Sequence, residues 1–247
     1  GLNDRIVLEK VSYNYPGAKL AGLNKISLDI KAGERIGIVG STGAGKTTLA
    51  DMILGLLPPS EGRIIVDGAP ITDENLRAWQ QSVGYVPQDI FLTDANIYEN
   101  IALGVPMLEI DQVRVRRAAE IARIDDFIRN DLPDDYETTI GERGVRLSGG
   151  QRQRIGIARA LYHEADLIVF DEATSALDNL TELEVMSAID ALPGEKTVLI
   201  IAHRLSTVKT CDRIIVLEKG RLVGCDTWDA LMDGNLAFRR IANLDTA

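Results

Sequence analysis

The residues with the clearest chemistry form a glycine-rich stretch at positions 40–48. It matches the phosphate-loop pattern G-x-x-x-x-G-K-[ST], in which backbone N–H groups and the start of a helix bind a polyphosphate. Lys46 is expected to reach the β- and γ-phosphates, and the Thr47 hydroxyl is expected to hold Mg²⁺. A glycine-rich turn without a ligand is the alternative, which the apolar run before the loop and the helical pattern after it disfavour. The predicted nucleotide contacts here are Gly40, Ser41, Thr42, Gly43, Ala44, Gly45, Lys46, Thr47 and Thr48.

Two acids follow a second apolar run. Asp171 and Glu172 come directly after Leu167–Phe170, which reads as a buried strand. Asp171 is expected to hold Mg²⁺, directly or through water, and Glu172 is expected to polarise the water that attacks the γ-phosphate. An Asp-Glu pair at a strand end can also be a simple edge charge. The buried run and the phosphate loop together favour the catalytic interpretation.

A second candidate for anion binding lies at residues 147–151, which read Leu-Ser-Gly-Gly-Gln before a helical pattern. A serine and two glycines at a helix start can bind an anion, although Ser148 could equally be an ordinary N-cap. One triphosphate does not need two such elements. The sequence therefore leaves the purpose of this second element open.

This pentapeptide resembles the signature motif of the nucleotide-binding domains of ATP-binding cassette (ABC) transporters, and the resemblance covers essentially the whole chain. It implies that Tyr15 stacks on adenine, with Tyr13 as a less favoured candidate and a core-facing strand aromatic as the structural alternative. It also implies that Gln88 approaches Mg²⁺ and the attacking water. His203 is then the residue that hydrogen-bonds the γ-phosphate, and His163, outside any motif, is expected on the surface.

The resemblance further implies that the site is shared between two copies of the chain. Residues 175–178 resemble the D-loop, which runs along the interface between copies. The ATP held by one copy is then contacted by the signature of the other. The residues expected to serve this shared site are Ser148, Gly149, Gly150, Gln151 and Asp178.

The elements that must position these residues indicate an α/β fold. Alternating strands and helices favour a mostly parallel sheet covered on both faces. The resemblance to ABC nucleotide-binding domains implies that this sheet belongs to a P-loop NTPase (RecA-like) core. We expect one ABC ATPase domain over residues 1–247, with an antiparallel β portion at about 1–34 and 61–70 and an inserted helical subdomain at about 89–150. Helical spacing is predicted for residues 89–101, 111–130 and 228–243.

The composition limits the kinds of partner and cofactor that the chain is expected to bind. The 247-residue chain has 27 Lys and Arg against 37 Asp and Glu, a net charge of −10, which disfavours a nucleic-acid partner. With two His and two Cys, a multi-histidine metal site is excluded, and ATP with Mg²⁺ is the expected cofactor pair. No apolar stretch approaches the roughly 20 residues that span a bilayer, and we expect a soluble domain.

Further stretches suggest an exporter. Residues 139–144 resemble the x-loop, which in exporters meets the cytoplasmic loops of the membrane domains, and residues 89–101 also look exporter-like. The abrupt start at Gly1 suggests a piece of a longer polypeptide that carries transmembrane domains. We therefore expect an ATP-dependent homodimer at the cytoplasmic face of a membrane, similar to flippases of lipid-linked oligosaccharides or polysaccharides.

Two rival classes remain at this point. One is a soluble ABC ATPase that acts on DNA, chromosomes or ribosomes, although such proteins typically have two cassettes, a coiled coil or basic surfaces. The other is a P-loop kinase or a non-hydrolysing structural module, in which the signature motif and the D-loop would have no role. The transported substrate is not encoded in this chain.

Overall fold

A computed structural model describes residues 1–17, 22–142, 144–172, 177–202 and 204–245. The chain forms two compact units. Unit 1 comprises Gly1–Val83, Asp166–Glu172 and Glu195–Ala247, and unit 2 comprises Gly84–Ala165 and Ala173–Gly194. The chain thus leaves unit 1 and returns to it twice, and the two units are considered separately below.

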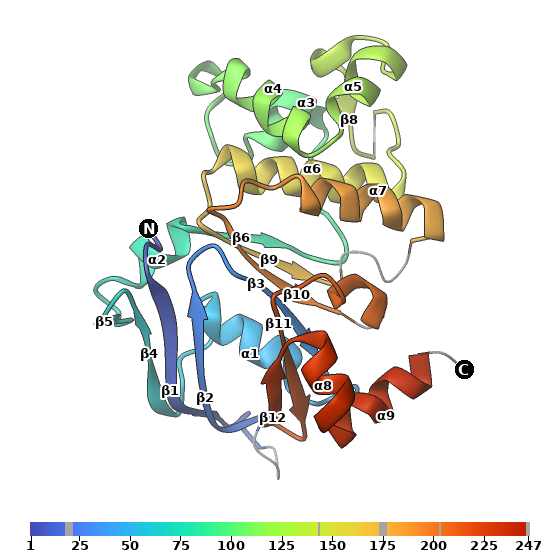
Figure 1. Cartoon of the computed structure of the whole chain (residues 1–247). Coiled ribbons are helices and arrows are strands. Elements are labelled where there is room, and N and C mark those ends of the chain that lie inside the picture. The colour runs from blue at the N-terminus through green and yellow to red at the C-terminus, as the bar shows by residue number, and fades with distance from the viewer. Residues whose placement is uncertain (18–21, 143, 173–176, 203, 246–247) are drawn as a thin grey trace. The chain divides into compact units, whose positions relative to one another are not determined.

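An antiparallel sheet lies near the N-terminus of unit 1, as the sequence predicted, with the strand order β2-β1-β4-β5 (Figure 1). Burial alternates over the first part of β1, where Ile6 and Leu8 are buried, Val7 between them is half-buried, and Arg5 and Glu9 are exposed. The strands are β1 (Arg5–Tyr13), β2 (Leu23–Lys31), β4 (Glu61–Val66) and β5 (Ala69–Pro70).

A second, mostly parallel sheet carries the predicted chemistry. Its unit 1 strands lie in the order β12-β11-β3-β10-β9, with β11, β3, β10 and β9 parallel and β12 antiparallel to β11. Every residue of β10 is buried, as expected for a strand covered on both faces. The strands are β3 (Arg35–Val39), β9 (Leu167–Asp171), β10 (Thr197–Ile201), β11 (Arg213–Glu218) and β12 (Arg221–Asp226).

Helix α1 (Lys46–Ile53) follows the phosphate loop and joins both sheets in one core. Its buried residues Leu49, Met52 and Ile53 belong to one cluster with buried residues of both sheets. The indole Nε1 of Trp79 donates a 2.8 Å hydrogen bond to the carbonyl oxygen of Ile53 and so ties down the end of α1. The remaining helices of unit 1 are α2 (Leu76–Gln81), η3 (Leu205–Val208), α8 (Trp228–Gly234) and α9 (Leu236–Asp245).

Unit 2 is mainly helical, with a short two-stranded sheet formed by β7 and β8. Strand β6 (Val83–Val86) begins at the last residue of the first stretch of unit 1. The other elements of unit 2 are β7 (Ala95–Asn96), α3 (Ile97–Ile101), η1 (Met107–Glu109), α4 (Gln112–Ile121), α5 (Asp125–Asp131), η2 (Asp135–Glu137), β8 (Thr139–Ile140), α6 (Gly149–Tyr162) and α7 (Asn179–Asp190).

The helix predicted over residues 89–101 is wrong for its first half. The helix begins only at Ile97, because Asn96 and Glu99 form a capping box at its N-terminus. The buried amide of Asn100 then holds the preceding segment in another conformation, since it accepts from Thr93 N and donates to the carbonyl oxygens of Thr93 and Ala95. The Asn96-to-Glu99 spacing is a helix-start signal that the periodicity argument overlooked.

Two longer predicted helices are interrupted. Between α4 and α5, Arg123 has a φ of 56°, and the amides of Arg123 and Ile124 donate to the carbonyl oxygens of Glu120 and Ala119. This is a Schellman ending in which arginine takes the position that glycine usually occupies. The tail helix breaks at Asn235, whose side chain accepts a 2.9 Å hydrogen bond from Phe238 N and starts α9.

Candidate functional site

The phosphate loop links the end of β3 to the start of α1. Gly45, the residue before α1, has a φ of 103°, and a Cβ there would lie 2.7 Å from the carbonyl oxygen of Gly22. Gly43 has a φ of 77°, but a Cβ there would meet nothing within 4 Å. Both positions favour glycine by conformation, and Gly45 also requires it for space.

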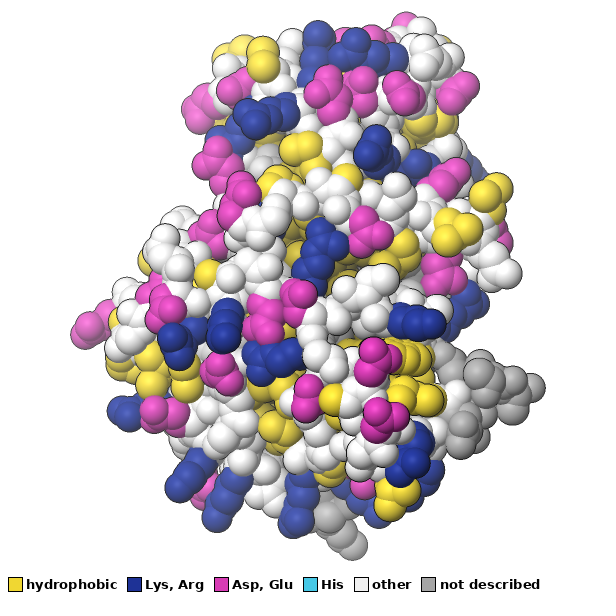
Figure 2. All heavy atoms as spheres, viewed as in Figure 1, with side chains coloured by type: hydrophobic (Ala, Val, Ile, Leu, Met, Phe, Trp, Pro, Cys, Tyr) yellow, Lys and Arg dark blue, Asp and Glu magenta, His cyan; other side chains and the backbone are white. Residues whose placement is uncertain are grey.

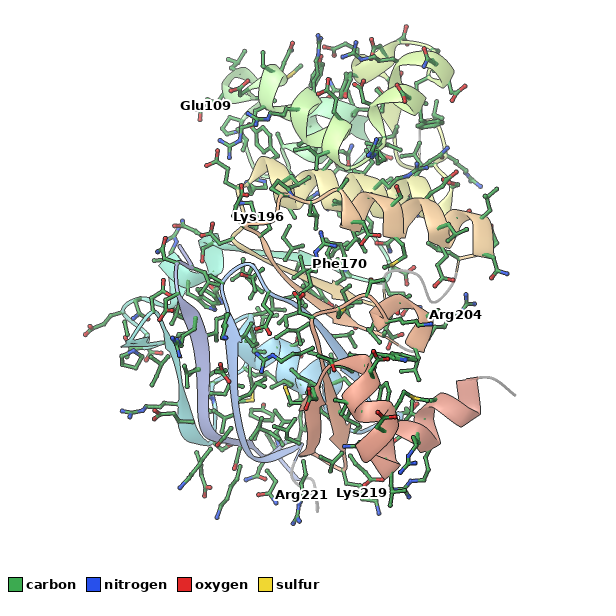
Figure 3. All side chains as sticks on the ribbon, viewed as in Figure 1. Glu109, Phe170, Lys196, Arg204, Lys219 and Arg221 are labelled. Carbon is green, nitrogen blue, oxygen red and sulfur yellow. The ribbon has the colours of Figure 1, made fainter. Side chains whose placement is uncertain are left out.

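The turn of the β11–β12 hairpin supports this loop. Gly220 N donates a 2.9 Å hydrogen bond to the carbonyl oxygen of Ala44. Because the peptide group is planar and trans, the N–H of Gly45 then points away from the hairpin, as a donor to a ligand would. Figure 3 labels Lys219 and Arg221, which flank Gly220 at this turn.

Lys46 is buried under the loop that it follows. The whole residue is 6% exposed, and its Nζ donates to the carbonyl oxygen of Gly40 at 2.9 Å and to that of Ser41 at 3.4 Å. Burial lowers the pKa of Lys46, while the negative charges of Glu172 and Asp171 act in the opposite direction. The structure thus brings the predicted phosphate-binding cation close to the two predicted acids.

Asp171 and Glu172 lie at the carboxyl edge of the parallel strands. Asp171 ends β9 opposite Ile201 of β10, and Figure 3 labels the preceding residue, Phe170. Glu172 has a φ of 50°, and its amide donates a 3.0 Å hydrogen bond to the carbonyl oxygen of Ile201. Left-handed backbone at a residue other than glycine costs about 1–3 kcal/mol and clusters at functional sites.

Asp51 is a third acid of this region, and the sequence interpretation missed it. Burial raises the pKa of Asp51, and the negative charge of Asp171 raises it further, which indicates that the two carboxyl groups interact. Asp51 follows Thr47 by one helical turn on α1. That i, i+4 spacing from the predicted Mg²⁺ ligand was the available signal.

Tyr15 does not face the core. The residue is 43% exposed, and its ring meets the ring of Tyr13 edge-on at 4.9 Å between centroids. The Tyr15 hydroxyl lies 2.9 Å from Thr48 Oγ1, so Thr48 is engaged from this side whereas Thr47 is exposed. An exposed ring joined to the phosphate loop could stack on a base, and that role of Tyr15 stays a prediction.

Unit 2 holds the signature residues and Gln88, whose side chain is exposed. Ser148 Oγ accepts from Gln151 N at 3.2 Å, and Ser148 N donates to Gln151 Oε1 at 2.7 Å, a capping box at the start of α6. Ser148 is therefore the N-cap of α6. The predicted contact of the motif with ATP stays a prediction. Gly149 is half-buried and Gly150 is buried.

The N-termini of α6 and α7 meet in unit 2. A Cβ at Gly150 would lie 2.1 Å from Thr181 Cγ2, and one at Gly149 would lie 2.8 Å from Leu177 Cδ2. Asp178 caps α7, since its carboxylate accepts from the amides of Leu180 and Thr181 at 3.1 Å each. These close approaches place two positive helix ends side by side, and the tighter one, at Gly150, favours glycine there.

Some predicted residues lie outside the described residues. These are His203, residues 175–176 of the predicted D-loop and residue 143 of the predicted x-loop. His163 is exposed, as expected, and its Nε2 lies 3.1 Å from the carbonyl oxygen of Leu103.

The described residues contain no cluster of three or more His, Cys, Asp and Glu side chains that could hold a metal ion by themselves. Thr47 and Asp171 nevertheless offer the oxygen ligands that suit Mg²⁺ when the phosphates supply the others. Within the same part of the chain, no helix has the length and apolar character needed to cross a membrane. On the face that Figure 2 shows, both signs of charge occur over each unit, unlike a nucleic-acid-binding face.

Comparisons with known proteins agree with this geometry. The family model described as "ABC transporter" matches residues 23–175. An ATP-dependent lipid A-core flippase of Ralstonia nicotianae is 45% identical over 226 residues, which cover 91% of this chain and 38% of the flippase. ABC transporter B family member 29, chloroplastic, of Arabidopsis thaliana is 45% identical over 212 residues, covering 86% of this chain and 33% of that protein.

A solved structure of a bacterial Atm1-family ABC exporter with ATP bound superposes with a TM-score of 0.88 and 37% sequence identity, over 99% of this chain and 42% of that one. The chain thus spans less than half the length of the relatives that it matches. The resemblance drawn from residues 147–151 and the fold class are confirmed.

Proposed function

The chain is an ATP-binding ATPase domain of the ABC transporter family, and we propose that it drives export or flipping of a substrate across a membrane. The observation that carries the proposal is the convergence of Lys46, Asp171 and Glu172 beside the phosphate loop of unit 1. The transporter names of the relatives favour this function over a soluble ATPase that acts on nucleic acids or ribosomes.

In the proposed reaction, water attacks the γ-phosphorus of ATP and the bond to the bridging oxygen breaks. ADP, inorganic phosphate and one proton are released. Glu172 orients the water from its fixed left-handed position, and Lys46 offsets the charge that develops on the phosphates. Thr47 and Asp171 would hold Mg²⁺, which supplies further neutralisation of the phosphate charge. Gln88 is assigned a place near Mg²⁺ and the attacking water, and His203 is assigned a hydrogen bond to the γ-phosphate.

We assign the signature residues and Asp178 to the ATP of a second copy. The close contact of Gly149 and Gly150 with the start of α7 supports this assignment, because it joins two positive helix ends that an anionic triphosphate can bridge. Two copies then enclose two ATP molecules, and hydrolysis removes the bridging charge and lets the copies part.

Transmembrane domains are the proposed second partner, and the cytoplasmic side of the membrane is the proposed location. A groove of about 910 Å³ in unit 2 offers them a docking surface, and Phe91 is 70% exposed there. The groove combines apolar, acidic and basic side chains, which suits an amphipathic helical segment. It is lined by Ile90, Phe91, Leu92, Thr93, Asp94, Gly141, Glu142, Arg146, Leu147 and Arg152.

For the substrate we propose a lipid-linked saccharide. The support is the similarity to lipid A-core flippases, which are 41–45% identical to this chain. The parts of those relatives that this chain does not cover would select the substrate. A transport assay with the full-length protein in vesicles containing lipid A-core, with a phospholipid as the control, tests this assignment.

The variant Glu172→Gln tests the ATPase mechanism. It removes the carboxylate that orients water but keeps the shape and the backbone, so we expect ATP binding, loss of turnover and an ATP-dependent dimer in sedimentation velocity. Glu109→Gln, an exposed residue of η1 labelled in Figure 3, is the matched control and should hydrolyse ATP normally. Wild-type turnover by Glu172→Gln would refute the assignment of Glu172.

A further inference from the structure

Gln153 is a buried amide that the mechanism above does not use. It lies on α6, and the whole residue is 3% exposed. Its Nε2 donates to the carbonyl oxygen of Pro87 at 3.1 Å and, over a shorter distance, to the carbonyl oxygen of Gln88. The backbone beneath the exposed Gln88 side chain is therefore held from the interior of unit 2.

The orientation of this amide is fixed by its partners. With two carbonyl oxygens on one side, only the NH₂ group can face them, because a flipped amide would set oxygen against oxygen. The other end, Oε1, is buried and has no hydrogen-bond partner among the residues that the structure describes. The side chain thus serves as a donor to this one segment while its own acceptor goes unsatisfied.

The rest of the segment packs against the same helix. A Cβ at Gly156 would lie 2.5 Å from Ile90 Cδ1, and one at Gly84 would lie 2.7 Å from the Cβ of Ala160. Arg159 Nη2 donates a 3.1 Å hydrogen bond to the carbonyl oxygen of Phe91. Residues 84–91 therefore follow α6 closely, and Gln153 fastens the end nearest to Gln88.

The same helix begins with the signature residues. Gln153 follows Ser148 by five residues, about 7.5 Å along a helix with a rise of 1.5 Å per residue. A short rigid stretch of α6 therefore joins the start of the signature to the backbone of Gln88.

We propose that Gln153 is a positioning residue that couples Gln88, which senses one ATP, to the signature that contacts the ATP of the second copy. This inference rests on the proposed sandwich of two copies. A shift of Gln88 on binding its own nucleotide is transmitted through Gln153 to α6, so that both sites become competent together.

Steady-state ATPase kinetics of the chain test the coupling. For Gln153→Leu we expect kcat about tenfold lower with KM for ATP nearly unchanged, since the loss falls on the competent dimer and not on the initial binding. Hydrogen exchange of a peptide covering residues 84–91 should also become faster. The control is Arg154→Met on the same helix. It loses a 3.0 Å hydrogen bond to the carbonyl oxygen of Arg123 and a 3.0 Å ion pair with Glu184, but no contact with Gln88. Equal kcat and equal exchange in the two variants would overturn the proposal.

Gln153→Glu provides a second readout within one folded protein. A buried carboxyl group has a raised pKa; when protonated it can donate one hydrogen bond to the carbonyl oxygens, and when ionised it repels them. We expect its kcat relative to wild type to rise as the pH falls from 8 to 6, whereas the ratio for Gln153→Leu stays flat. Parallel profiles for the two variants would contradict the proposal.

The variant Glu172→Gln separates this inference from the proposed function. If Glu172→Gln forms no dimer with ATP, the proposed dimer around ATP is wrong, and the coupling that rests on it is wrong as well. If it dimerises and the Gln153 variants behave as wild type in kinetics and exchange, the coupling alone fails.

Discussion

Two glycines of the phosphate loop allow the packing argument to be tested with a matched pair of substitutions. Gly43 and Gly45 have φ angles of 77° and 103°, so alanine is strained at both. They differ in space, since a Cβ at Gly43 meets nothing within 4 Å whereas one at Gly45 lies 2.7 Å from Gly22 O and 2.8 Å from Leu23 Cδ2. Gly45→Ala should therefore be the more destabilising change.

The magnitudes follow from these geometries. Left-handed backbone costs an alanine about 1–2 kcal/mol, which is the whole effect expected for Gly43→Ala. Gly45→Ala adds about 1–3 kcal/mol because a backbone carbonyl oxygen and a packed methyl group must move. The reduced entropy of the unfolded chain favours both variants alike and cancels in the comparison. The free energies of unfolding should thus differ by about 1–3 kcal/mol.

Urea unfolding without nucleotide, followed by tryptophan fluorescence, measures this difference. Both tryptophans, Trp79 and Trp228, lie in unit 1, and Trp79 is hydrogen-bonded to the last residue of α1. The fluorescence therefore reports the unfolding of the unit that contains the phosphate loop. Equal midpoints for the two variants at unchanged slope, or a larger loss for Gly43→Ala, would refute the reasoning.

Two further predictions concern charges in unit 1. Burial raises the pKa of Glu34, but hydrogen bonds from Arg213 and Lys31 N outweigh it, so the pKa lies below its ordinary value; Glu34→Gln should cost about 1 kcal/mol at pH 7. Because the folded pKa is depressed, this cost should begin to shrink near the unfolded pKa of about 4.3 and be lost only as the pH falls through the lower folded pKa, and urea titrations at pH 7 and at about pH 2 check it. Asp51 has a raised pKa from burial and from Asp171, so its ionised form destabilises the fold. Asp51→Asn should therefore raise the urea midpoint at pH 7 and leave it unchanged below about pH 4, and a lower midpoint at pH 7 would contradict the sign.

The sequence predicted most of unit 1 because its signals are local. Three local patterns each predict one element: the phosphate loop, the buried strand before Asp171, and the alternation of Ile6 and Leu8. Helix ends were harder, since the break at Arg123 depends on an arginine in a conformation usually taken by glycine.

Features that depend on distant contacts escaped the sequence. The role of Asn100 follows from a carbonyl seven residues away, and that of Gln153 follows from carbonyls about 65 residues away. The interaction of Asp51 with Asp171 likewise depends on how α1 meets β9. No periodicity or propensity encodes such pairings, so these residues could be assigned only from the folded structure.

The central claim is that each ATP site combines the phosphate loop of one copy with the signature of another. Mixing two inactive variants tests it directly. Lys46→Ala removes the phosphate-binding cation, and Ser148→Arg places a bulky charge in the signature. A heterodimer of the two retains one intact site. Combined in equal amounts, they should recover up to about a quarter of wild-type ATPase activity, because half of the dimers would each carry one complete site. No recovery above the sum of the separate variants, at concentrations where the wild type is active, would contradict the account.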